Sequence, residues 1–81
     1  MNIMEKFDID RILEGYVEFG RFCEFLKEIR KEGGINKYIC LVEDNIDRSR
    51  DLTYKNIWRE NLKWLKDNRD KLGRCEKGLI N

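Results

Sequence analysis

The chain has few of the side chains that carry out catalysis. It contains no histidine, so the usual base beside a serine or cysteine nucleophile is missing. The remaining acid–base candidates are four carboxylates on the outer face of a predicted helix: Glu14, Glu18, Glu28 and Glu32. Solvated carboxylates make poor general acids. The pair Gly33–Gly34 lacks the Lys and Ser/Thr of a phosphate-binding loop. We therefore expect a protein that is not an enzyme.

The three cysteines, Cys23, Cys40 and Cys75, have no paired spacing of the kind that metal sites use. We expect no metal and no cofactor. An odd cysteine count and a charged N-terminal stretch predict a reducing, cytoplasmic location. No apolar run approaches the about 20 residues that span a membrane. Cys23 and Cys40 fall on apolar faces and are expected in the core, whereas Cys75 is expected in an exposed tail.

The charge is divided between the two parts of the chain. Residues 1–47 carry seven Lys/Arg and eleven Asp/Glu, a net charge of −4, while residues 48–81 carry ten and five, a net charge of +5. Surface potential acts locally, so a basic face attracts an acidic partner although the whole chain is near neutral. The division predicts binding to another molecule.

Six basic residues form the clearest pattern with a functional meaning: Arg48, Arg50, Lys55, Arg59, Lys63 and Lys66. The last four, which we call the basic stripe, recur at intervals of four, four and three residues and so share one side of a helix. Such a stripe is typical of contacts to nucleic-acid phosphates. The alternative is an ordinary solvated face of mixed charge.

Three aromatic residues are candidates for contacts with a protein partner: Phe25, Tyr54 and Trp64. Phe25 falls on the charged side of its predicted helix, and Trp64 falls at the edge of an apolar face. Exposed aromatic residues beside Arg and Lys are enriched in protein interfaces. The alternative for Trp64 is partial cover by the first helix.

Apolar residues at spacings of three and four predict helices throughout the chain. The first helix is expected over about 10–32, ending at Gly33, and the third over about 52–72, ending at Gly73. The segment 35–47 has the same spacing, although 38–42 alone resembles a short buried strand. Ile57 is expected in the core. The tail 74–81 is expected to fray.

We therefore predict a single all-α domain over 1–81, a three-helix bundle with two long helices and a shorter middle one. The alternative is a helical hairpin in which the last two helices fuse. The apolar band of the first helix is too wide for two neighbours to cover, which favours a homodimer.

The function we expect is a small helical protein-binding module, a regulator or inhibitor that acts by occlusion. Its composition is of the kind common among phage and mobile-element accessory proteins, an analogy of composition only. The alternative function is nucleic-acid binding through the basic stripe.

Overall fold

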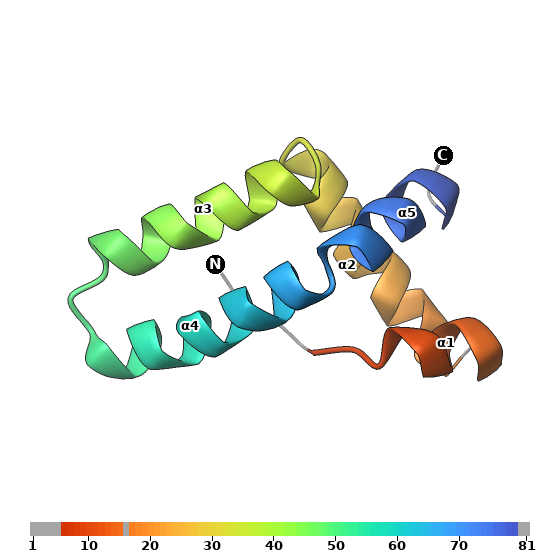
Figure 1. Cartoon of the computed structure of the whole chain (residues 1–81), viewed down its shortest axis with the longest axis horizontal. Coiled ribbons are helices and arrows are strands. Elements are labelled where there is room, and N and C mark those ends of the chain that lie inside the picture. Colours follow the sequence, from red (N-terminus) through yellow and green to blue (C-terminus); the bar gives the residue numbers. More distant parts are fainter. Residues whose placement is uncertain (1–5, 16, 80–81) are drawn as a thin grey trace.

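The computed structural model describes residues 6–15 and 17–79, and everything it describes is helix or connection. The helices are α1 (Ile9–Gly15), α2 (Phe19–Lys31), α3 (Ile35–Arg48), α4 (Leu52–Asp67) and α5 (Arg69–Leu79), shown in Figure 1. The all-α class is confirmed. The three-helix count is wrong, because each of the two long predicted helices is broken into two.

The first break falls at Glu18, between α1 and α2. Glu18 has φ 58° and ψ 22°, in the left-handed region, and it is the one described residue other than glycine with positive φ. This conformation costs a non-glycine residue about 1–2 kcal/mol. Ile9 and Ile12 before the break and Phe22 after it are all buried. The helical spacing of apolar residues therefore continues across the break, so the spacing alone does not predict where α1 ends.

The second break falls at Asn68, between α4 and α5. The Asn68 side-chain amide donates to the carbonyl of Trp64 at 2.9 Å and so caps the end of α4. Gly73 does not end a helix as expected, since α5 continues to Leu79. Residues 74–79 of the tail that we expected to fray are thus helical here, and residues 80–81 lie outside the described part. Fraying in solution stays a prediction.

The middle segment is a helix, and the strand alternative for 38–42 is wrong. α3 follows a glycine turn in which the Gly34 amide donates to Ile29 and the Gly33 amide to Arg30, both at 3.0 Å. This is the Schellman pattern that ends a helix, and it requires the positive φ of 100° found at Gly33. The expected end of the first long helix at this glycine pair is confirmed.

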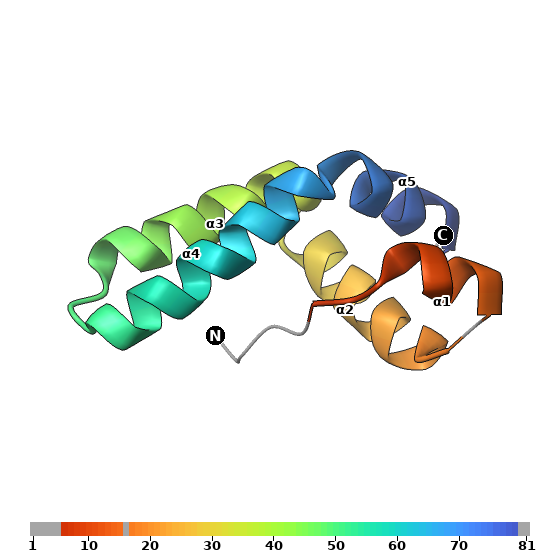
Figure 2. The same ribbon diagram turned by 60° about the horizontal axis from the view of Figure 1, so that its bottom comes forward.

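α3 and α4 form an antiparallel hairpin, and α2 and α5 pack against its inner half (Figures 1 and 2). α1 packs on α2, away from the hairpin. The core at this inner end includes Phe22, Leu26 and Ile29 of α2 with Leu65 and Leu72, all 0% exposed. The outer half of the hairpin projects beyond the other described helices. The molecule is therefore elongated, with extents of 39 × 22 × 19 Å.

Candidate interaction surfaces

Phe25 is not the exposed residue that the sequence predicts. Its ring centroid lies 5.5 Å from that of Phe7, 6.1 Å from that of Tyr38 and 6.1 Å from that of Trp64. Phe7, which precedes α1, contacts the ring, as do Tyr38 and Trp64 of the hairpin. Phe25 is therefore half-buried and joins α2 to α3 and α4. Phe25 therefore contributes to the packing between these helices.

The other two aromatic candidates lie at different places on α4. Trp64 is half-buried against Phe25, which agrees with the alternative of partial cover by the first predicted helix. Tyr54 lies on the outer half of the hairpin, where its ring packs against Trp58 with centroids 6.1 Å apart. The structure thus brings Phe25 and Trp64 together inside the molecule and leaves Tyr54 apart from them.

Ile57 is 42% exposed, so its expected place in the core is wrong. It precedes Trp64 by seven residues, about two helical turns, and the two side chains point the same way. Trp64 meets Phe25 of α2, whereas α2 lies beside the inner half of the hairpin and not its outer half (Figure 2). The outer half of α4, which we call the arm, therefore has apolar side chains at its surface. They are those of Leu52, which is 72% exposed, Tyr54 and Ile57.

The basic stripe lies where the sequence places it, mostly in solvent. Arg59, Lys63 and Lys66 are exposed and Lys55 is half-buried. Lys66 pairs with Glu43 of α3, its Nζ 3.6 Å from the carboxylate. Within the described residues the other three form no ion pair. An acidic residue of α3 therefore lies beside one end of the stripe and reduces its potential.

Arg48 and Arg50 are exposed at the turn between α3 and α4. Neither has an ion-pair partner in the described part of the chain. The same turn holds Asp51, whose carboxylate accepts from the Thr53 amide at 2.9 Å and the Tyr54 amide at 3.2 Å. Asp51 is therefore engaged as the N-cap of α4. The two arginines remain available to a partner.

The cysteines do not follow the expected burial. Cys40 is exposed and Cys23 is half-buried. Cys75, a residue of α5, is buried. Cys75 was expected in a loose tail, but α5 returns it to the core. Burial raises the pKa of its thiol, nearby Arg74 lowers it and Cys23 raises it. Over residues 6–15 and 17–79 there is no group of three His, Cys, Asp or Glu that could hold a metal.

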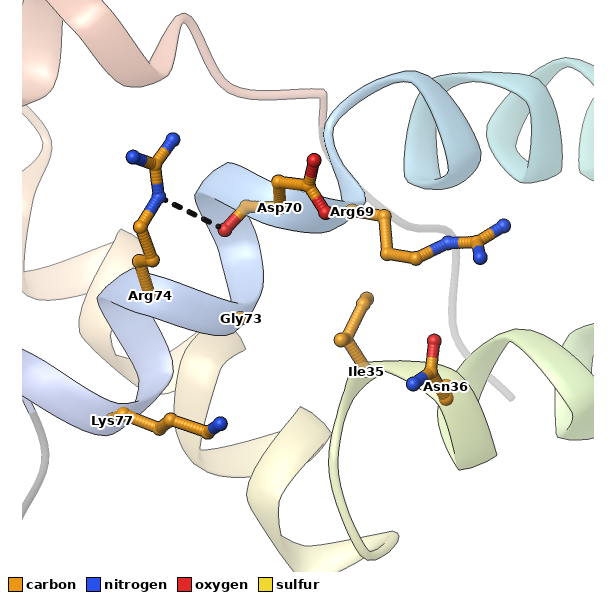
Figure 3. Close-up of a pocket in the computed structure, with 7 residues that line it drawn as sticks. All are labelled: Ile35, Asn36, Arg69, Asp70, Gly73, Arg74 and Lys77. Carbon is orange, nitrogen blue, oxygen red and sulfur yellow. Dashed lines mark hydrogen bonds between the residues drawn. The ribbon is translucent and has the colours of Figure 1, made fainter.

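A groove of about 500 Å³ lies where the start of α3 meets α5. Its lining comprises Ile35, Asn36, Arg69, Asp70, Gly73, Arg74 and Lys77, drawn in Figure 3. Sequence reasoning missed this site because it joins residues that lie more than 30 positions apart. A signal was nonetheless present, since three basic residues recur on one short segment around a glycine.

Neither a protein-family model, nor a curated protein, nor a solved structure matches the chain. No helix in the described residues has the length and apolar character needed to cross a membrane.

Proposed function

We propose that the protein is a non-enzymatic protein-binding module that acts by occlusion, docking a partner on the arm. The observation that carries this proposal is the position of Ile57. It continues the row of Trp64 along α4, but it is 42% exposed, whereas Trp64 packs against Phe25 of α2. A partly exposed isoleucine beside a half-buried tyrosine is surface that gains free energy when a second protein covers it.

The charges around the arm indicate the chemistry of that partner. Arg48, Arg50, Lys55 and Arg59 lie at the same end of the hairpin and have no ion pair within the described part of the chain. A partner surface with apolar side chains at its centre and carboxylates at its rim complements this arrangement. Such rim charges speed association and select the orientation, while the apolar contacts supply most of the affinity.

Nucleic-acid binding through the basic stripe is the second candidate. The exposure of Arg59 and Lys63, both unpaired within the described residues, favours it. The ion pair between Lys66 and Glu43 counts against it, because it places a carboxylate where phosphates would lie. Nucleic-acid affinity would fall steeply with salt concentration, whereas affinity from apolar contacts would change little.

The proposal is tested by comparing two substitutions at equally exposed sites. Ile57 is 42% exposed on the arm and Leu13 is 43% exposed on α1. Each is changed to Glu, and the proteins retained from lysate of the source cells are identified at two salt concentrations. We expect one protein to be retained by the wild type and by Leu13→Glu, and lost with Ile57→Glu.

Two outcomes overturn this assignment. Equal retention by all three forms would show that the arm is not the docking surface. Retention of nucleic acid instead, lost on raising the salt and on changing Lys63 to Glu, would favour the second candidate. Circular dichroism of each variant checks that the helices remain.

A further inference from the structure

We propose that the groove between the start of α3 and α5 binds an acidic, extended segment of a protein partner. The inference rests on the proposed function, since it takes the partner to be a protein, and it assigns a second contact far from the arm. The groove lies at the inner end of the hairpin, while the arm lies at the outer end (Figure 1).

The floor of the groove is formed by an isoleucine and a glycine. Ile35 forms part of it and is 9% exposed, and Gly73 faces it from α5. A Cβ atom added at Gly73 would lie 3.6 Å from the Cγ2 of Ile35, an ordinary van der Waals separation. The absence of a side chain at Gly73 thus leaves a strip of surface that a partner's apolar side chain can cover.

The rim of the groove is basic. Arg69, Arg74 and Lys77 line it together with a single acidic residue, Asp70. None of the three forms an ion pair within the described residues, and the Nε of Arg74 donates only to the backbone carbonyl of Asp70, at 3.4 Å.

Cations next to this rim are already neutralised. Lys71 pairs with Asp10 at 3.1 Å, and Arg30 pairs with Glu76 at 3.7 Å. The cations of α5 without an ion pair in the described part of the chain, Arg69, Arg74 and Lys77, are therefore all residues that line the groove. That charge complements an acidic ligand.

The spread of the cations indicates a chain with several carboxylates. Arg69 and Lys77 stand on either side of Ile35 and Gly73 in Figure 3, and Arg74 points away from both. A single phosphate group would need donors that converge on one point. Arg69 and Lys77 are separated by about 12 Å along a helix. Carboxylates three to four residues apart in an extended chain span about the same distance.

A labelled peptide with Glu at its first and fifth positions and Leu between them is the probe. Its affinity is measured by fluorescence anisotropy for the wild type, Arg69→Glu, Lys77→Glu and the control Lys63→Glu, which reverses an exposed, unpaired charge on the basic stripe. We expect each groove variant to weaken binding about tenfold, and the control to weaken it less than about twofold.

Gly73→Leu tests the floor of the groove without changing its charge. Leucine is a better helix former than glycine, so α5 should remain folded while the side chain fills the groove. We expect this variant to lose peptide binding. In the wild type the peptide should shift the amide resonances of Gly73 and Asn36 before those of the arm.

The groove assignment is overturned by equal weakening with Lys63→Glu, by shifts confined to the arm, or by no binding at millimolar peptide. Tighter binding of a DNA oligonucleotide than of the peptide at the same salt concentration would also overturn it. These outcomes leave the comparison of Ile57→Glu with Leu13→Glu unaffected. Failure of the groove is therefore distinguishable from failure of the proposed function.

Discussion

Asn61 is the polar residue buried in the described core. It is 4% exposed on α4, and its side-chain nitrogen has no hydrogen-bond acceptor. A buried donor without an acceptor costs about 1–3 kcal/mol, and an apolar side chain of similar volume avoids that cost. We expect Asn61→Leu to raise the free energy of unfolding by about 1–2 kcal/mol in urea melts.

Asn68→Leu is the matched control, because Asn68 does find an acceptor at the carbonyl of Trp64. That variant should be less stable than the wild type. If Asn61→Leu were also less stable than the wild type, the side-chain amide of Asn61 would contribute to stability, which would contradict this prediction.

Ionisation of Tyr38 makes the free energy of unfolding depend on pH in the alkaline range. Burial first, and then the carboxylates of Glu28 and Glu32, raise its pKa above the ordinary value of 10.0. Because the folded pKa lies above the unfolded one, the neutral phenol contributes stability that is fully present below about pH 10 and is lost as pH rises through the folded pKa. Cys75, raised from 9.0, acts in the same direction.

We expect Tyr38→Phe to lose less free energy of unfolding than the wild type between about pH 9 and about pH 11. Tyr54→Phe, which removes a hydroxyl on the arm, is the control. Denaturant melts at several pH values measure the difference. Equal alkaline losses in the wild type and in Tyr38→Phe would show that Tyr38 is not responsible.

At the level of the helices, the N-cap of α4 is formed by a single side chain, so one substitution removes it. The Asp51 carboxylate accepts from two backbone amides, at 2.9 and 3.2 Å. We expect Asp51→Ala to lower stability by about 1 kcal/mol, and Asp51→Asn to change it little, because asparagine caps equally well. The urea midpoints of the two variants measure this. Equal losses in both would mean that charge, and not the hydrogen bonds, is what α4 requires.

Two helix boundaries marked by local chemistry could be predicted from the sequence, whereas the end expected at Gly73 is wrong and the two breaks were missed. Gly33–Gly34 and Asp51 carry their own signals, a left-handed turn and a side-chain acceptor. The breaks at Glu18 and Asn68 carry little, because the apolar spacing on both sides serves the same core. Gly15 and Gly20, which flank the first break, are the residues that could have indicated it.

The candidate surfaces follow the same division. The exposure of the basic stripe follows from helical spacing alone, so most of it could be predicted. The burial of Phe25 depends on Phe7 and Trp64, which are distant in sequence and meet it only in the fold. The groove likewise requires α5 to return against the start of α3. The spacing of residues along one segment does not predict contacts with segments that are distant in sequence.

At the scale of the whole molecule, the homodimer stays a prediction. Much of the wide apolar band of the first predicted helix is covered within one chain, since Phe22, Leu26 and Ile29 are 0% exposed, but Leu13 on the same band is 43% exposed. Sedimentation equilibrium at micromolar concentrations distinguishes a dimer from a single species near 9.9 kDa. A rise toward twice this mass that Ile57→Glu abolishes would make a second copy the occupant of the arm.

Docking on the arm is tested most directly by a photo-crosslinking residue placed at position 57, with position 13 as the equally exposed control. The protein is expressed in its source cells, illuminated, and analysed by denaturing electrophoresis and mass spectrometry. Contact at the arm should give one discrete adduct with one protein from position 57 and none from position 13. No adduct from position 57, or the same adducts from both positions, would show that the arm is ordinary solvent-facing surface.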